Sequence, residues 1–462
     1  MKGRFSMKRL LLSVIIVALL FSFVPLEPVE AAETYYEVWG DYATTKTMAD
    51  HYIRTEWDPK TDTETYVYLY SGQKMKLEMN VFMSKGNDFT KLSSSDYTVT
   101  YGNLTKVGTH KITVKGKGKH SKLNKTINVK IVKKWDASIR RFYGNTRYET
   151  STTIAKCMRM LYNGDQKFDD IFVTSGEKFP DGLSGGSIAK LHRSPILNWS
   201  KAKNKQVQDF IKANVKKGGT VYVLGGPLAV GNEISKNMGN YKFVRLKGND
   251  RFGTNEAILK HYEDYYKQRM GGNSLEWGEC ILVDWNNWES AMIASGTGAA
   301  IMLVGPNGLT SGQKQYLKNK KNWNYILLGK EASLNKAYSN LTGLKIPKYQ
   351  ISRIKGNNAD ELSVNFAKSY YYYPKDFFIA KAGVGKTKAT DFADGLCAGP
   401  LAHGPILLVG NSNPKIDAYI KSLKVVHSVT VFGGPLAVSD ANAKKIAKNS
   451  KQSPWVEFNL LK

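Results

Sequence analysis

Arg141-Phe-Tyr-Gly144-Asn145 is the first of three copies of the pattern Arg-x-x-Gly-Asn, which returns as Arg245-Leu-Lys-Gly248-Asn249 and Arg353-Ile-Lys-Gly356-Asn357. The glycines are 104 and 108 residues apart in a chain of 462 residues. Solenoid repeats have periods of about 20 to 50 residues, whereas about one hundred residues make a small domain. The sequence therefore predicts three copies of one domain, with limits at 138–240, 241–348 and 349–462.

Two further motifs return in the first and third copies. Phe179-Pro-Asp181-Gly-Leu183 matches Phe392-Ala-Asp394-Gly-Leu396, and Gly225-Gly-Pro-Leu-Ala-Val230 matches Gly433-Gly-Pro-Leu-Ala-Val438. Any function assigned to this region must therefore fit a repeated unit.

Each copy alternates short apolar runs with helical patterns. In the first copy the runs 168–174, 195–198 and 220–224 are separated by helical segments at 181–191 and 205–215. Buried strands that alternate with helices indicate a parallel sheet covered by helices on both faces. The predicted fold class is therefore α/β.

These motifs, in this order, resemble the putative cell wall-binding repeat, type 2 family, whose repeats occur in threes on Gram-positive surface proteins. The resemblance covers residues 138–450. It implies three Rossmann-like or flavodoxin-like domains in a pseudo-threefold arrangement. It also implies non-covalent attachment to an anionic wall polymer, either teichoic-acid-like or a secondary polysaccharide.

The second and third copies depart from the family pattern. The second copy has Ser290 at the Asp position and Gly329-Lys330-Glu331 in place of Gly-Gly-Pro. The third copy has Ala359 and Leu362 where the other copies have Arg and Thr. The three sites are therefore not expected to be equivalent.

The candidate polymer-binding residues fall into three groups. Arginine suits bidentate contacts with phosphate or carboxylate, although a structural tie between domains is the alternative for the first arginine of each copy. An Asp at the start of a helix either complements the helix dipole or orients a polymer group. In the family, the Pro-Ile-Leu strand has been linked to wall binding, although such a strand is more simply core. The candidates are Arg141, Arg147, Arg245, Arg251, Arg353, Asp181, Asp394, Ile196, Leu197, Ile301, Met302, Ile406 and Leu407.

The N-terminal part of the chain predicts export and a separate β-module. Residues 1–32 combine basic residues, an apolar run from Leu10 to Val24 and small residues near Ala31, as a cleaved signal peptide does. Residues 33–62 fit no pattern. Residues 63–133 contain short alternating strands and resemble the immunoglobulin-like modules of surface proteins, which implies a small all-β sandwich with a spacer or adhesive role.

The net charge of +28, from 67 basic and 39 acidic residues, calls for an anionic partner. Outside a cell, the candidates are wall polymers, lipid headgroups and nucleic acid. Together with the family resemblance, the charge favours a wall polymer, with no nucleic acid and no membrane after signal cleavage. A nucleic-acid binder is supported by charge alone.

No enzyme, cofactor or metal site is expected. The 7 histidines have no ligand spacing, and the 3 cysteines form no Cys-x-x-Cys pair. Gly383-Val-Gly385-Lys386-Thr387 lacks the first glycine of a phosphate-binding loop, because Ala380 stands at that place. The alternative to a wall-bound protein is a secreted hydrolase or other enzyme with its site at the strand C-termini, where doubly wound sheets bind ligands.

Overall fold

The computed structural model describes residues 35–41, 52–58, 63–70, 78–85, 88–133, 137–162, 166–178, 180–182, 184–269, 278–383, 393–447 and 455–459. The expected signal peptide and most of the Gly383–Thr387 segment lie outside these ranges. Within the ranges, no helix has the length and apolar character needed to span a bilayer.

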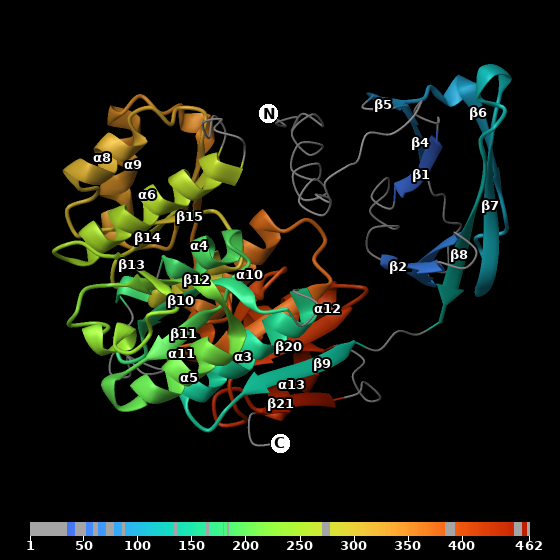
Figure 1. Cartoon of the computed structure of the whole chain (residues 1–462). Coiled ribbons are helices and arrows are strands. Elements are labelled where there is room, and N and C mark those ends of the chain that lie inside the picture. The colour runs from blue at the N-terminus through green and yellow to red at the C-terminus, as the bar shows by residue number, and fades with distance from the viewer. Residues whose placement is uncertain are drawn as a thin grey trace.

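The N-terminal part folds as two sheets that share one apolar core (Figure 1). The alternating pattern is confirmed, but two strands come from residues 33–62, which the sequence analysis left unassigned. These are β1, which pairs with β4, and β2, which pairs with β3. The three-stranded sheet is β1 (Tyr35–Asp41), β4 (Glu78–Lys85) and β5 (Asp88–Lys91). The five-stranded sheet, in spatial order, is β2 (Tyr52–Asp58), β3 (Thr63–Leu69), β8 (Asn124–Val132), β7 (Gly108–Gly116) and β6 (Tyr97–Tyr101).

The rest of the chain contains three parallel sheets, which define units 1, 2 and 3. Units 1 and 2 have the orders β11-β10-β12-β13 and β15-β14-β16-β17, which is the flavodoxin-like order 2-1-3-4. Unit 3 has the order β19-β18-β20-β9-β21. The expected α/β fold class is confirmed. The strands are β9 (Ser138–Tyr143), β10 (Phe168–Ser175), β11 (Ile196–Trp199), β12 (Val215–Leu224), β13 (Lys242–Leu246), β14 (Glu279–Asp284), β15 (Ala300–Val304), β16 (Asn324–Leu328), β17 (Ile351–Ile354), β18 (Asp376–Lys381), β19 (Ile406–Val409), β20 (Ser428–Phe432) and β21 (Trp455–Asn459).

Helices cover the sheets because the central strands are apolar on both faces. In unit 2, for example, Ile281 and Leu282 of β14 are both fully buried. The helices are α3 (Arg147–Tyr162), α4 (Gly185–Leu191), α5 (Asn204–Asn214), α6 (Arg251–Arg269), α7 (Trp288–Ser295), α8 (Ser311–Leu317), α9 (Ala332–Gly343), α10 (Ala359–Tyr370), α11 (Ala393–Leu396), α12 (Pro414–Ser422) and α13 (Asp440–Ile446).

The first strand of each sequence copy lies in the sheet of the preceding unit. β13 pairs with β12 of unit 1, β17 pairs with β16 of unit 2, and β9 pairs with β20 of unit 3. The chain then passes into the next unit, where α3 packs on β11, α6 on β15 and α10 on β19. The sequence repeats are therefore offset from the structural units by one strand, and β9 closes the series into a ring.

The three units meet through the small-residue segments that follow their first strands. Gly186 lies against Ser295, Ser295 lies against Gly399, and Gly182 lies against Leu396, so each unit touches both others. A Cβ built on Gly399 would lie within 2.6 Å of Ser295 Cβ, a separation that real Cβ atoms essentially never show. One large core cluster includes residues of all three units, such as Ile188, Ile301 and Phe378. The arrangement fits the threefold gathering that the resemblance implies.

Candidate functional site

Each sheet has a topological switch point, where the first and third strands lie side by side. Ligands of doubly wound folds bind at the carboxyl ends of such strands. In unit 1, Asp181 follows β10 within the turn Pro180–Gly182, and Gly225 follows β12. A Cβ added to Gly225 would lie 2.5 Å from Asp181 Oδ2, and in unit 3 one added to Gly433 would lie 2.7 Å from Asp394 Oδ2. Both units thus place a carboxylate at the same point of the crevice.

The glycines in these turns have a conformational reason to recur. Gly225 has φ +104° and Gly433 has φ +98°, in the left-handed region that side chains with a Cβ rarely adopt. Gly225 and Gly433 therefore satisfy two requirements at once, the turn after the strand and the close approach of the carboxylate.

The next unit borders the unit 1 crevice. The side chain of Asp181 is hydrogen-bonded to Thr254 and lies near Arg251, both in the first turn of α6. Burial raises the pKa of Asp181, and the contacts with Thr254, Arg251 and Lys178 oppose that rise. Arg251 in turn lies over the Trp285 ring, with its guanidinium carbon 4.4 Å from the ring centroid.

The junction of units 3 and 1 repeats this arrangement. The helix that contains Asp394, α11, packs on α3, whose first turn contains Arg147 and Thr150. Thr150 Oγ1 accepts a hydrogen bond from the Gly144 amide at 3.1 Å, and Thr254 Oγ1 accepts one from the Gly248 amide at 3.2 Å. Arg147 donates to the carbonyl of Gly176 at 2.6 Å. Two of the three junctions thus keep the same set of side chains.

The third junction, between units 2 and 3, lacks the Asp of the one unit and the Arg and Thr of the next. Ser290 replaces the Asp on α7, and α7 packs on α10, where Ala359 and Leu362 replace Arg and Thr. In the sequence these losses fall in two different copies. In the structure, the three substituted positions lie at the same junction, so only one of the three sites has diverged.

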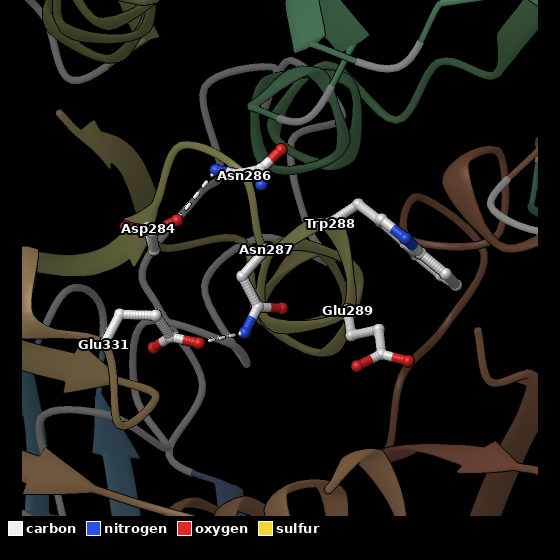
Figure 2. A pocket seen from close by; sticks show the side chains of 6 residues that line it. All are labelled: Asp284, Asn286, Asn287, Trp288, Glu289 and Glu331. Carbon is white, nitrogen blue, oxygen red and sulfur yellow. Dashed lines mark hydrogen bonds between the residues drawn. The ribbon is translucent and has the colours of Figure 1, made fainter. Parts of the chain in front are cut away.

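The diverged junction contains a pocket of about 300 Å³, drawn in Figure 2. Glu331 lies with its carboxylate against Gly329, in the position that the Asp occupies in the other units. Asn287 Nδ2 donates to Glu331 Oε1 at 2.5 Å, and Asp284 Oδ2 accepts from Ser333 Oγ at 2.5 Å. The lining residues are Asp284, Asn286, Asn287, Trp288, Glu289 and Glu331.

The chemistry of this pocket is that of hydrogen-bond acceptors. Burial raises the pKa of Glu289, the Gly383 amide that donates to it at 2.9 Å opposes the rise, and the charge of Glu331 adds to it. The described residues that line the pocket include no histidine, serine or cysteine. Across the described residues, no group of three or more His, Cys, Asp or Glu side chains could hold a metal ion.

The first arginine of each copy makes structural contacts, which agrees with the alternative to polymer binding that its sequence leaves open. Arg141 is fully buried and donates to the carbonyls of Gly433 and Val438 at 2.7 and 2.8 Å and to Asp440 at 2.8 Å. The guanidinium therefore fastens the loop after β20, and it is not available to bind a polymer anion.

Arg245 and Arg353 make the same kind of contact. Arg245 donates to the carbonyls of Gly225 and Val230, both at 2.9 Å. Arg353 donates to the carbonyls of Gly329 and Glu331 at 3.0 and 3.1 Å. Each arginine thus holds the loop of the preceding unit, to whose sheet its own strand belongs.

The Pro-Ile-Leu strands form part of the core, which is the simpler of the two readings that their sequence allows. These strands are β11, β15 and β19, which lie inside the sheets, and all six side chains are at most 1% exposed. In this structure the six side chains are packing residues, and their role in polymer binding stays a prediction. The residues are Ile196, Leu197, Ile301, Met302, Ile406 and Leu407.

Sequence reasoning missed two exposed leucines beside the crevices. Leu228 and Leu436 occupy the same place in the two Gly-Gly-Pro-Leu-Ala-Val loops and are 95% and 101% exposed. The sequence contained a signal for these residues, because a leucine recurs at the same position of a repeated Gly-Gly-Pro turn, where an exposed polar residue is usual. The middle copy has Ala332 at this place.

Two segments, residues 141–235 and 353–443, match the model of cell wall binding domain 2 (CWB2). A curated relative, the amidase enhancer of Bacillus subtilis (strain 168), is 22% identical over 204 residues, which are 44% of this chain and 26% of the relative.

Two solved structures from Clostridium difficile share the fold. Cwp8 has a TM-score of 0.56 at 19% identity and covers 77% of this chain, and Cwp6 has a TM-score of 0.54 at 17% identity and covers 81%. The chain covers 64% of the Cwp8 chain and 66% of the Cwp6 chain. Two segments of the protein, in its first and third copies, thus match the CWB2 model, and it is an extracellular protein of the cell wall.

Proposed function

We propose that the protein is exported and held non-covalently on the wall by an anionic secondary polymer. The observation that carries this proposal is the match of two segments to CWB2, each of which supplies one crevice carboxylate, Asp181 or Asp394. The net charge of +28 supports an anionic partner, because such a chain attracts a polyanion and releases its counterions on binding.

The polymer is bound at the two junctions that keep the common set of side chains. The carboxylates of Asp181 and Asp394 accept hydrogen bonds from polymer hydroxyls, and Arg251 and Arg147 lie at the edge of the crevices. Leu228 and Leu436 stand fully exposed on the adjoining loops and pack on the apolar faces of sugar rings. A single exposed leucine needs no explanation, but the same exposed position in two copies does.

Two sites on one rigid body make the attachment strong without requiring a strong single contact. Binding at the first site raises the effective concentration of the polymer at the second. The β-module, residues 63–133 with the strands contributed from 33–62, is the part displayed beyond the anchor.

The proposal is tested by sedimentation with purified Gram-positive wall. Protein that pellets with intact wall and remains in solution beside wall stripped of its anionic polymers supports the proposal. A variant in which both Asp181 and Asp394 are replaced by Asn should pellet less at equal stability. If that variant binds wall as well as the wild type does, the carboxylates of the crevices do not bind the polymer.

A further inference from the structure

A basic cleft lies at the opposite end of the unit 2 sheet from the crevices. It has a volume of about 560 Å³ and is formed by the turn that leads from α8 to β16 and by the end of α9. Both segments precede strands, so they lie at the amino ends of the parallel strands, away from Asp284 and Glu331. In Figure 1, α8 and α9 also lie far from the β-module. The cleft is lined by Lys318, Asn319, Lys321, Asn322, Gly343, Leu344 and Lys345.

Three exposed lysines line this cleft, and no acid stands among its described lining residues. Within the part of the chain that the structure describes, Lys318, Lys321 and Lys345 form no ion pair, whereas Lys320 does. The remaining lysine of the α8–β16 turn, Lys320, is different, because its Nζ is 2.9 Å from Glu263 Oε2. Like charges gathered in this way repel one another unless an anion binds between them.

The backbone of these lysines is fixed by a buried side chain and by hydrogen bonds within the two segments. Trp323 is fully buried, its amide donates to the Lys320 carbonyl at 3.2 Å, and Tyr325 Oη donates to the same carbonyl at 2.7 Å. Lys345 has φ +61°, and its amide donates to the Thr342 carbonyl at 2.9 Å. The lysine stems therefore start from fixed points, which reduces the ordering cost of binding.

The corresponding turns of the other units are occupied differently. In unit 1, Lys216 is paired with Asp169 at 2.7 Å. In unit 3, Val425 is buried against Val67 of the β-module. Among the described residues, the turn of unit 2 thus carries lysines that form no ion pair, whereas the turns of the other units carry a paired lysine and a buried valine.

We propose that this cleft binds a phosphodiester segment of the wall polymer, an inference that rests on the proposed function. Lysine binds phosphate as a point charge, and the amides of Asn319 and Asn322 supply further donors. A cleft of about 560 Å³ accommodates more than one phosphate-linked residue. Unit 2, which lacks the Asp of the crevices, thus contributes to polymer binding through its lysines, at the amino ends of its strands.

The test compares two triple variants of the full chain. The cleft variant is Lys318→Gln, Lys321→Gln and Lys345→Asn, with Asn chosen because it tolerates positive φ. The matched control is Lys201→Gln, Lys205→Gln and Lys212→Gln, which removes the same charge from exposed positions of unit 1. Affinity is measured for a short glycerol-phosphate oligomer and for a polygalacturonate oligomer of equal charge, at several salt concentrations.

We expect the cleft variant to bind the phosphate oligomer at least tenfold more weakly than the wild type, and the control to stay within about twofold to threefold. The slope of log affinity against log salt should fall by about 2 in the cleft variant, since each lost contact removes about 0.7. Unchanged melting temperatures show that both variants fold.

Three outcomes overturn the proposal. Equal losses in the two variants indicate diffuse attraction by surface charge. Tighter binding of polygalacturonate through the same lysines identifies a carboxylate ligand. If the wild type binds wall but does not bind the phosphate oligomer, the cleft does not take a phosphodiester. The proposed function is unaffected by that result. Failure of the proposed function is separate, because the wild type would then not pellet with wall.

Discussion

At the scale of the residue, the three recurrent arginines and glycines have structural reasons. Each arginine donates to carbonyls of the preceding unit, and Arg141 does so from a fully buried position. A Cβ on Gly144 would lie 2.2 Å from Glu149 Cβ, and one on Gly248 would lie 2.2 Å from the Gly253 carbonyl carbon. Recurrence in all three copies therefore reflects how the ring of units is closed.

We predict that Arg141→Lys lowers stability more than Arg353→Lys does. Lysine keeps the charge but cannot donate to three acceptors with a planar fork, so about 2 to 3 kcal/mol is lost at the buried site and about 1 at Arg353. Urea unfolding measures the difference. Unchanged stability together with loss of wall binding at low temperature would restore a ligand role for Arg141.

A second prediction concerns the exposed leucines. Replacing both Leu228 and Leu436 by Ala should weaken wall binding about tenfold and leave the melting temperature unchanged, because neither side chain packs against the protein. Leu161→Ala is the control, since Leu161 is 54% exposed on α3, away from the loops. If the control weakens binding as much as the double variant, the loops have no special role.

At the scale of the element, strand exchange joins the units. β9 lies between β20 and β21 in the sheet of unit 3. A chain that stops at Ala447 lacks β21 and exposes the edge of β9, which also carries Arg141. Such a chain should melt several degrees lower and aggregate more readily, as unprotected edge strands do. A light-scattering and melting comparison with the full chain checks this, and equal behaviour would show that β21 adds no protection.

The junction of α4 and α6 should make the fold sensitive to acid. Burial, together with the nearby His192, lowers the pKa of His261 to about 4, and the charges of Asp264 and Asp170 oppose that shift. Burial also lowers the pKa of His192, although its hydrogen bond to Asp170 opposes that shift. Both rings stay neutral in the folded chain, while the unfolded chain takes up protons below about pH 6.5.

Stability should therefore fall as pH drops from about 6.5 towards 4, and be retained above that window. For the partly exposed His261 the effect is about 1 kcal/mol after allowance for solvent screening. The slope of melting temperature against pH should be smaller in His261→Gln than in wild type or in a His110→Gln control on the β-module. An unchanged slope in His261→Gln would contradict this assignment.

The sequence predicted the elements well because apolar runs and their spacing are local properties. The strands expected at 168–174 and 220–224 are present as β10 and as the second half of β12. The neighbour of each first strand was not predictable, because a repeat shows which residues recur and not which unit they touch. For that reason Arg141 was assigned to a ligand, while Ser290 and Ala359 looked like unrelated losses.

At the scale of the whole molecule, the three copies form one body. They share a core cluster, and each sheet is completed by a strand from the next copy. Residues 137–462 should therefore fold without the β-module, with a cooperative melting transition. A single copy, residues 138–240, should not fold, because β9 would lack both of its partners, β20 and β21, and β12 would lose β13 and keep only β10. Circular dichroism distinguishes the two outcomes, and a folded single copy would contradict the account of strand exchange.

The central claim is attachment through an anionic polymer, and one sedimentation measurement tests it most directly. Residues 137–462 are mixed with purified wall before and after its anionic polymers are removed, at about 0.1 M salt and at about 0.5 M salt. The account predicts that the protein pellets with intact wall at low salt, and that it stays in solution at high salt or beside stripped wall. Equal pelleting with intact and stripped wall would contradict it.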